Sequence, residues 1–572
     1  MTKDADFYPQ WIEEPPRKGS YRSIFKWGAP DVFKHPNRRL YATLKEKLHL
    51  TDDDFREKQQ LGNEPVRLDQ PVRLSKEQIA RFAEIVGSEN VTTDEYSRVK
   101  FSHGKTMEEA VQLRHGIAEH VSDLVVHPRS KEDVQRIVTY CHEQTIPVYV
   151  YGGGSSVTFG LKTVNRGITL VMGTHMNRVL ELNETNQTIT VEPGLMGREY
   201  EALLNDAPKT FGAQRSYTGG HFPQSFKYSS IGGWIVTLSS GQQSSYYGDM
   251  YDIVLSQEYV TPAGSFRTLE YPAAATGPKL NDIMKGSEGA YGILVNATLK
   301  IFRYMPENRL RFAFLFRSWE DAVNAAREIS QGEFGMPSLF RISDPDETDI
   351  ALKLGGVDKT ILDRFLRFRG YEPLRRCLYI GHTDGERSFC KNVKRNVRKI
   401  ARAFHAMYLT GYPVRKWEEG RYTDPYMRED LNDFGIMIDT LESSVTWDNL
   451  HNLHNCVREY IERRPRTICM THASHFYPQG TNLYFIFIGK MKDLAEYREF
   501  QAGIIDQILK HGGSLSHHHG IGKMIAPWIE EHLGTVQMDV LRSLKRHFDP
   551  HTIMNPGGTL GLDMTNSSKR ST

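Results

Sequence analysis

The sequence predicts an α+β protein built from more than one domain. With 572 residues, the chain is too long for a single hydrophobic core. Residues 118–302 are dense in short strand patterns and glycines, whereas helical patterns such as residues 319–329 alternate with strand patterns such as residues 378–380 after Pro306. A glycine-rich strand domain followed by a domain of mixed helices and strands therefore accounts for most of the chain.

Composition excludes several classes of function. The chain carries 72 basic and 70 acidic residues, so its overall charge favours neither nucleic acid nor an anionic membrane as a partner. Its five cysteines show no C-x-x-C spacing, which indicates reduced thiols. No apolar run approaches the ~20 residues that span a bilayer, and neither secretion nor peroxisomal signals are recognised at the ends. We expect a cytoplasmic location and no nucleic-acid partner.

Residues 148–160, VYVYGGGSSVTFG, predict a diphosphate-binding turn. A strand at residues 124–126 and a helix opened by Ser130 and Asp133 precede it, and Pro147 leads into the strand that ends at the glycines. Backbone N–H groups in such a turn can hold phosphate oxygens, so the expected ligand is a nucleotide. A Rossmann fingerprint read from Gly152 needs glycine or alanine at residue 157, which is valine. The Gly-Lys-Thr at residues 104–106 would need glycine at residue 99 to form a P-loop, and that residue is also valine. A glycine turn without a ligand is the alternative.

Residues 388–409 predict a basic amphipathic helix, with apolar residues at helical spacing and lysines and arginines over the rest of its surface. Such a helix could lie on a membrane. A solvated helix face at the protein surface is the other interpretation.

Four motifs in order, PVYVYGGGSS, YSSIGGW, KGSEGAYGIL and IMNPGG, resemble the vanillyl-alcohol oxidase or p-cresol methylhydroxylase (PCMH) type of FAD-binding family. Within that family, SLSHHHGIGK and Trp234 resemble the alkyldihydroxyacetonephosphate (alkylglycerone-phosphate) synthases. The resemblance implies a PCMH-type FAD-binding domain of two subdomains, an inserted α/β substrate (cap) domain and a C-terminal return to the FAD domain. The implied division is an N-terminal arm with a helical segment (1–117), the FAD domain (118–302), the cap (303–504), a segment completing the active site (505–560) and a disordered tail (561–572).

The resemblance also implies the residues that contact FAD. They fall in four groups along the FAD domain: Val150, Tyr151, Gly152, Gly153, Gly154, Ser155 and Ser156; Gln224, Ser225, Phe226, Lys227, Tyr228, Ser229 and Ser230; Thr237, Leu238, Ser239 and Ser240; and Glu288, Gly289, Ala290, Tyr291, Gly292, Ile293 and Leu294. The sequence around Arg114 does not match the loop that carries a covalently attached flavin in this fold, so we expect noncovalent FAD.

Catalytic and substrate-binding roles follow from the same resemblance. It implies a tyrosine acid or base at Tyr477, functional histidines at His221, His517, His518 and His519, and substrate arginines at Arg428 and Arg341. The implied reaction exchanges the acyl group of acyl-dihydroxyacetone phosphate for a fatty alcohol, without net redox change, through a covalent adduct at the flavin N5. A proton must leave and return at the reacting carbon, which calls for tyrosine or histidine, and a phosphate calls for arginine.

Each of these residues has a plainer interpretation. Neighbours on a strand alternate sides, so the three histidines are not expected to share one centre, and His517 with His519 could form part of a metal site although no third ligand is evident. Arg428 could pair with Glu429 or Asp430 on a helix surface, Tyr477 could be a buried strand tyrosine, and Arg341 could belong to a salt bridge.

Some positions depart from the synthase pattern. Phe222 and Gln224 stand where the synthases have acids, Leu238 where they have arginine, and Ala290 where they have threonine. An FAD-linked oxidoreductase of a 2-hydroxy acid or another alcohol is therefore the second hypothesis, and a flavin-binding protein without catalysis is the third. The expected partner is a small-molecule or lipid substrate, and peripheral membrane contact and a homodimer are left open.

Overall fold

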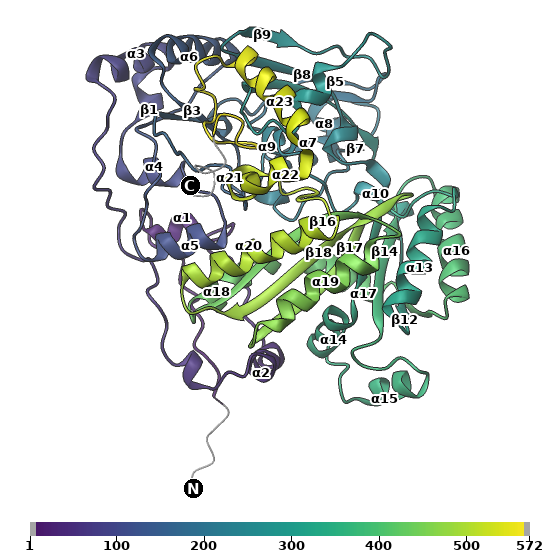
Figure 1. Cartoon of the computed structure of the whole chain (residues 1–572). Coiled ribbons are helices and arrows are strands. Elements are labelled where there is room, and N and C mark those ends of the chain that lie inside the picture. Colours follow the sequence, from purple (N-terminus) through teal and green to yellow (C-terminus); the bar gives the residue numbers. More distant parts are fainter. Residues whose placement is uncertain (1–6, 565–572) are drawn as a thin grey trace.

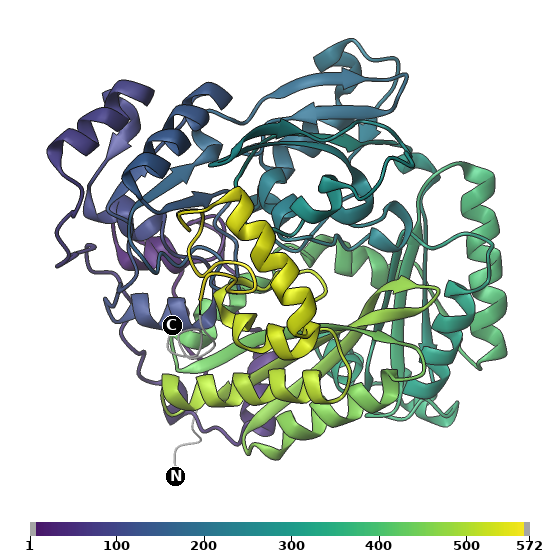
Figure 2. The same cartoon turned by 45° about the horizontal axis from the view of Figure 1, so that its top comes forward.

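A computed structural model describes residues 7–564 (Figure 1). Two small sheets lie at one end of the molecule and a seven-stranded sheet forms the other. The C-terminal helices, yellow in Figure 2, return from the large sheet to the small ones. Within residues 7–564 no helix has both the length and the apolar character needed to cross a membrane.

The first small sheet contains the predicted glycine-rich turn. Its strands, in spatial order, are β1 (Val91–Thr92), β2 (Leu124–Val126), β4 (Ile168–Val171) and β3 (Val148–Tyr151). β2, β4 and β3 run parallel, which requires a crossover between β2 and β3. The predicted helix supplies it as α6 (Lys131–Gln144), and the Ser130 side chain accepts a hydrogen bond from the backbone N–H of Asp133. The helix buries its apolar face on this sheet.

The second small sheet is antiparallel and contains a hairpin of β5 and β6. Its strands are, in spatial order, β5 (Val179–Asn183), β6 (Thr188–Val191), β10 (Ile293–Lys300), β8 (Val254–Thr261) and β9 (Gly264–Arg267). The helices inserted among these strands are α7 (Gly197–Asn205), α8 (Ala207–Phe211), α9 (Ile231–Val236), α10 (Ser244–Tyr247), α11 (Met250–Ile253) and α12 (Leu280–Met284). A short pair, β7 (Tyr217–Thr218) with β11 (Phe302–Arg303), leads into the large sheet.

The large sheet is antiparallel throughout. Its strands are, in spatial order, β15 (Met407–Thr410), β12 (Leu310–Phe316), β14 (Cys377–Thr383), β13 (Leu339–Ser343), β17 (Thr467–Tyr477), β18 (Gly480–Lys490) and β16 (Ile436–Thr446). One face is covered by α13 (Trp319–Ser330), α16 (Arg387–Ala403), α19 (Leu450–Arg463) and α20 (Leu494–Lys510). The second face carries α14 (Pro345–Leu354), α15 (Ile361–Phe368), α17 (Tyr412–Gly420) and α18 (Met427–Asn432).

The predicted helix at residues 388–409 is shorter than expected. α16 ends at Ala403, and residues 407–410 form the edge strand β15. Val393, Val397 and Ala401 are buried against the large sheet and α13. The apolar stripe that suggested membrane contact is therefore part of the core, and only the basic face of α16 meets solvent.

The N-terminal segment does not form a separate arm. Its helices are α1 (Tyr21–Phe25), α2 (Arg38–Lys47), α3 (Lys76–Val86), α4 (Glu95–Lys100) and α5 (Met107–Arg114). α3 opens with a capping box and buries Phe82 on the first small sheet. By contrast, α2 packs Leu44 against Ile350 and Ile436 on the second face of the large sheet. The segment thus connects the two ends of the molecule.

The C-terminal segment returns to the first small sheet, as α21 (Gly522–Ile525), α22 (Ile529–Leu533) and α23 (Thr535–Phe548) lead to a bridge between Met554 and Val148. The buried Lys545 ammonium donates to the carbonyl oxygens of Ala290 and Met554, both at 2.7 Å. The expected disorder from residue 561 is wrong for residues 561–564, because Leu562 is buried and the Asp563 carboxylate accepts the Gly557 N–H. Residues 565–572 of that predicted tail lie outside the described residues.

Candidate active site

A cavity of about 610 Å³ lies between the small sheets and the second face of the large sheet. The glycine-rich turn and the loop before α9 form one wall, and β13, β16, β17 and β18 form the opposite wall. Trp27, Leu40, Thr43 and Leu44 from the N-terminal segment close one side. The contribution of α2 could not be predicted from the sequence, because the strand and helix residues it meets at the cavity, such as Ile350 and Ile468, lie about 300 or more positions away.

The glycine-rich turn fits an anion. The backbone N–H groups of Gly153, Gly154, Ser155 and Ser156 donate to no acceptor within residues 7–564, and the turn lines the cavity. Successive unpaired N–H groups of this kind hold phosphate oxygens. Packing around the turn also requires glycine at one of these positions. A Cβ on Gly153 would lie 2.3 Å from the Tyr228 carbonyl oxygen, so glycine here lets the turn pack against the neighbouring loop.

Most of the predicted cofactor residues line this cavity. They are Val150, Gly152, Gly153, Gly154, Ser155, Ser156, Gln224, Ser225, Ser229, Ser230, Thr237, Ser239, Ser240, Glu288, Gly289, Gly292, Ile293 and Leu294. The other predicted positions do not line it; they are Tyr151, Phe226, Lys227, Tyr228, Leu238, Ala290 and Tyr291. Tyr151, for example, packs edge-on against Phe101, because side chains in and just after a strand alternate sides.

Strand alternation and one bulge place the polar groups of the opposite wall. His472 and Ser474 on β17 face the cavity together with Tyr484 on β18, while residues of the other parity enter the core. The pairing of β17 with β18 is irregular between Ser474 and Tyr477, where His475 has a positive φ of 55°. This bulge turns His475 toward the cavity as well.

The three consecutive histidines lie in a loop after α20, not on a strand. Glu442 of β16, which is 3% exposed, accepts hydrogen bonds from the backbone N–H groups of His517 (2.7 Å), His518 (3.1 Å) and His519 (3.1 Å). It also accepts the Ser516 hydroxyl at 2.8 Å. Burial alone would raise the pKa of this carboxyl, but the histidines and the N–H donors lower it. Glu442 therefore stays ionised and fixes the loop backbone.

A second carboxylate fixes the other end of the loop. Glu288 accepts the N–H groups of Ile521 (2.7 Å) and Gly522 (2.9 Å) and has a positive φ of 46°. Neither role was predicted: Glu442 was not singled out at all, and Glu288 was assigned only to FAD.

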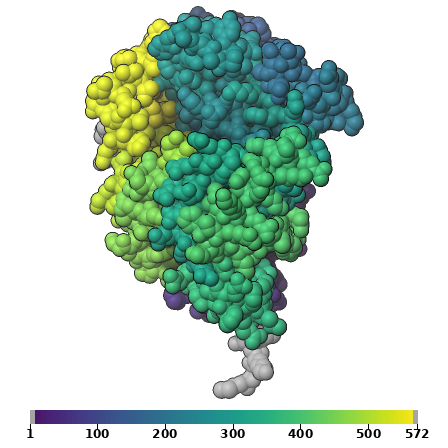
Figure 3. Space-filling model, turned by 90° about the vertical axis from the view of Figure 1, so that its right-hand side faces the viewer, coloured from purple at the N-terminus to yellow at the C-terminus, as the bar shows by residue number. Residues whose placement is uncertain are grey.

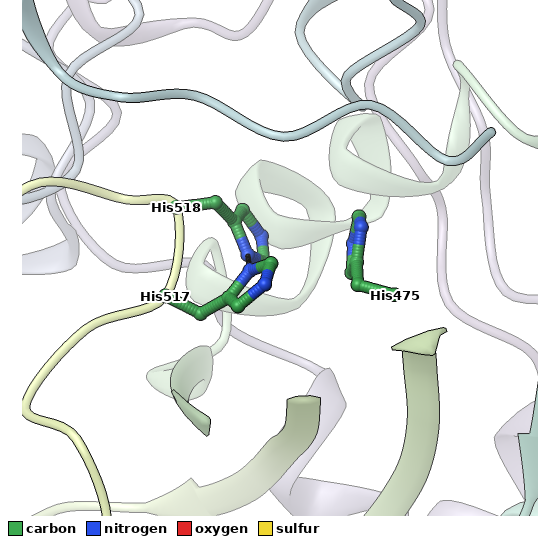
Figure 4. A group of neighbouring side chains, drawn as sticks. All are labelled: His475, His517 and His518. Atoms are coloured by element: carbon green, nitrogen blue, oxygen red, sulfur yellow. Dashed lines mark hydrogen bonds between the residues drawn. The ribbon is translucent and has the colours of Figure 1, made fainter. Parts of the chain in front are cut away.

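His475, His517 and His518 form a cluster, in which one ring nitrogen of each lies within 4.8 Å of the others (Figure 4). The His517 and His518 Nδ1 atoms are 3.0 Å apart, and the His475 Nδ1 lies 2.7 Å from the Ser244 hydroxyl oxygen. Burial lowers the pKa of all three imidazoles, and the neighbouring histidines add to this effect. The rings are therefore neutral bases. The cluster could also hold a divalent cation, in which His475 and His518 rather than His519 would join His517.

The predicted catalytic residues separate into two layers. His518 and His519 line the cavity, whereas His517 lies behind them and its Nε2 is 2.8 Å from the Tyr477 hydroxyl oxygen. Tyr477 also donates to Asp249 at 3.3 Å and does not line the cavity. His221 is buried beside Trp234 and Ser239, outside the cavity lining, and burial lowers its pKa to about 3.

The tyrosine at the cavity wall is Tyr484. Its ring stacks on His518 with centroids 5.9 Å apart, and its hydroxyl lies 3.0 Å from that of Thr440. Burial raises its pKa to about 12. Tyr484 was not singled out from the sequence.

Arginines also line the cavity. Arg428 on α18 pairs with neither Glu429 nor Asp430; its Nη1 donates to the Lys105 carbonyl at 3.1 Å, while its Nε is buried without a partner. Arg421, which was not predicted, likewise has a buried Nη1 with no partner. These unsatisfied donors suit an anionic ligand.

Arg341 differs from these two, because its Nη2 lies 2.6 Å from the Glu347 carboxylate, which is also 3.1 Å from His472 Nδ1. Burial would raise the pKa of Glu347, but Arg341 and His472 hold it well below its usual range. Arg341 therefore lines the cavity as one half of an ion pair.

Away from these polar groups the cavity has an apolar arm. Leu40 and Leu44 of α2 face Ile350 and Leu354 of α14, and the wall continues over β16, β17 and β18 with Ile438, Ile468, Met470, Ile486 and Ile488. Leu354, at the end of α14, is 36% exposed, so the arm reaches the protein surface there.

Fold and site together define an FAD-dependent enzyme of the FAD-linked oxidase class. Residues 122–270 match the family model described as "FAD binding domain", and residues 305–559 match "FAD linked oxidases, C-terminal domain". The donor-rich glycine turn and the lining residues fit this cofactor, and FAD is the cofactor of the chain.

Comparison with individual proteins narrows the class. The chain is 30% identical to the alkyldihydroxyacetonephosphate synthase of Dictyostelium discoideum, over 92% of this chain and 88% of that protein. A solved alkyldihydroxyacetonephosphate synthase is 28% identical and superimposes with a TM-score of 0.78 over 94% of this chain and 99% of its own. The chain belongs to the alkyldihydroxyacetonephosphate synthase family. Substrate-bound p-cresol methylhydroxylase, 16% identical over 86% of this chain and 98% of its own with a TM-score of 0.62, shares the fold.

Proposed function

We propose that the chain exchanges the acyl group of acyl-dihydroxyacetone phosphate for a fatty alcohol, giving alkyl-dihydroxyacetone phosphate and a fatty acid. One observation carries this proposal: a single cavity joins a nucleotide-binding turn, neutral histidines and unpaired arginine donors to an apolar arm. A 2-hydroxy acid would need the polar groups but not the apolar arm, whereas both substrates of the exchange carry a long chain. The names of the relatives support the same assignment.

In this proposal the arginines hold the phosphate. Arg428 and Arg421 each present a buried guanidinium nitrogen without a partner, and a guanidinium keeps its charge at any physiological pH. Arg341 contributes less charge because Glu347 neutralises it. The acyl chain and then the alcohol chain occupy the arm between α2 and α14.

The remaining residues move protons. Breaking the ester C–O bond releases the fatty acid, and forming the ether C–O bond with the alcohol transfers the hydroxyl proton to the protein. The glycine turn would hold FAD, and that cofactor would supply an electron-poor ring able to take up and give back an electron pair. His518, a neutral imidazole at the cavity wall, can accept a proton from the reacting carbon, and the protonated Tyr484 beside it can donate one. His517 and Tyr477 extend this network behind the wall.

An isotope-exchange assay tests the proposal. FAD-loaded protein is incubated anaerobically with acyl-dihydroxyacetone phosphate and a labelled fatty alcohol, and labelled ether product and free fatty acid are quantified. We expect equal amounts of both without any electron acceptor. No ether product, together with reduction of an artificial acceptor by a 2-hydroxy acid, would replace the transferase with an oxidoreductase.

A further inference from the structure

The strand wall of the apolar arm changes from apolar to polar at one cross-strand pair. On β17 and β18 three successive pairs line the cavity: Ile468 with Ile488, Met470 with Ile486, and His472 with Tyr484. Residues two apart on a strand face the same side, so these pairs follow one another along the wall at intervals of about 7 Å. A chain that lies on the two apolar pairs therefore places its head group at His472 and Tyr484.

The helix beside this wall changes in the same order. α14 lines the cavity with Glu347, Ile350, Ala351 and Leu354, which share one side of the helix because residues three and four apart are neighbours there. Leu354 lies at the surface, whereas Glu347 is buried in the first turn. Figure 1 shows α2 and α14 at the end of the molecule remote from the small sheets, and in Figure 3 this end is the narrow one. The arm therefore runs inward from the narrow end to its polar groups.

Glu347 and His472 form a hydrogen-bonded pair at the inner end of the arm. Glu347 Oε1 lies 3.1 Å from His472 Nδ1 and 2.6 Å from Arg341 Nη2. Burial would raise the pKa of this carboxyl, but Arg341 and His472 lower it, so it is ionised. An ionised carboxylate can only accept, so Nδ1 carries the proton of the imidazole and Nε2 carries the lone pair. Within residues 7–564, Nε2 has no hydrogen-bond partner.

The surroundings of His472 make it a second base in the cavity. Burial lowers the pKa of its imidazole, and the charge of Arg341 adds to this effect although Glu347 opposes it. The ring stacks on Tyr484 with centroids 4.9 Å apart, and Tyr484 also stacks on His518 of the histidine loop. The cavity therefore holds two neutral imidazoles around one tyrosine, one at the loop and one at the end of the apolar arm.

We propose that His472 is the base that takes the hydroxyl proton of the fatty alcohol, and that Glu347 is its positioning residue. The fatty acid leaves its carbon as a carboxylate, with the bonding electron pair. A lone pair of the alcohol oxygen then forms the ether C–O bond to that carbon, the O–H bond breaks, and its proton passes to His472 Nε2. The imidazolium, held by Glu347, returns the proton to water, so the step needs no oxidant or reductant.

This inference rests on the function proposed above and assigns the two proton transfers to different residues. His518 takes the proton of the reacting carbon, and His472 takes the proton of the alcohol. Loss of His472 should therefore slow ether formation and leave the release of fatty acid intact, whereas a purely structural residue would affect both steps.

The two steps are timed separately with the full FAD-loaded chain. Wild type, His472→Gln and Glu347→Gln are mixed with acyl-dihydroxyacetone phosphate, and released fatty acid is followed before a labelled fatty alcohol is added and labelled ether after it. The matched control is His382→Gln, because His382 is a buried histidine of the same sheet, 2.9 Å from Glu418, and does not line the cavity. Melting temperature and flavin content confirm that each variant is folded.

We expect His472→Gln to slow ether formation at least about 100-fold and to leave fatty acid release within about twofold of the wild type, because general base catalysis contributes about 10²–10⁴-fold. Glu347→Gln should slow ether formation about tenfold, since an amide can donate as well as accept and no longer fixes the proton on Nδ1. The His382→Gln control should perform both steps at the wild-type rate.

Ether formation at the wild-type rate in His472→Gln would overturn the inference, as would an equal loss of both steps in that variant. In either case a wild type that makes ether and fatty acid keeps the proposed function. A wild type that forms no ether would refute the proposed function and this inference with it.

Discussion

Replacing Glu442 with glutamine should disable the histidine loop while keeping the shape of the side chain. The Glu442 carboxylate accepts four hydrogen bonds, one from the Ser516 hydroxyl and one from each backbone N–H of His517, His518 and His519. An amide has one acceptor oxygen with two lone pairs, so about two of these hydrogen bonds are lost. At about 1.5 kcal/mol for each bond to a charged acceptor, the loss is about 3 kcal/mol. If this whole free energy is lost from the ordered conformation of the histidine loop, the fraction of enzyme with an ordered loop, and with it kcat, drops about 100-fold.

The assay measures kcat for acyl exchange, flavin content and melting temperature in the Glu442→Gln variant. The matched control is Asp123→Asn, because Asp123 is a buried carboxylate that accepts the N–H of Arg73 at 3.0 Å and does not line the cavity. We expect both variants to melt earlier and both to keep FAD, but only Glu442→Gln to lose kcat. A Glu442→Gln variant with wild-type kcat and pH profile would refute the role assigned to this carboxylate.

Four further predictions follow from the same structure. Gly153→Ala should lower flavin content and melting temperature, because its Cβ would meet a carbonyl oxygen at 2.3 Å, and overpacking of this kind costs about 1–3 kcal/mol; normal FAD saturation would contradict this. Tyr484→Phe should reduce kcat more than Tyr477→Phe, because only Tyr484 of the two lines the cavity. The reverse order in steady-state kinetics would make Tyr477, behind the cavity wall, the proton donor. Leu44→Trp should shorten the apolar arm and shift the preference toward shorter alcohols, measured as relative kcat/KM. An unchanged preference would mean that the alkyl chain of the alcohol binds outside this arm. Because burial lowers the pKa of His518 below its ordinary value of 6.5, its contribution to stability is present above pH 6.5 and is lost as the pH falls through the folded-state pKa; a free energy of unfolding that stays constant in denaturant titrations below pH 6.5 would contradict this.

The sequence predicted the features that depend on local pattern. The bounds of β2 and the start of α6 at Ser130 were predicted correctly, because the apolar run and the capping residues lie within or beside the elements themselves. The position of the glycine-rich turn after a strand was predicted correctly. The contact that requires glycine at residue 153 was not, because it involves Tyr228, 75 positions further along the chain.

The rest of the site depends on contacts between distant segments. Glu442 meets the histidine loop only because β16 lies at the edge of the large sheet beside it, and nothing near Glu442 in the sequence signals this. His475 reaches the cavity through a bulge that reverses strand parity, which alternation alone could not predict.

The most direct test of the central claim is the flavin absorbance of the FAD-loaded protein on anaerobic mixing with acyl-dihydroxyacetone phosphate, recorded together with released fatty acid. If one cavity brings the lipid, the flavin and the histidines together, the visible absorbance should fall as fatty acid appears, and it should recover when a fatty alcohol is added. An unchanged spectrum with no fatty acid released would contradict that account.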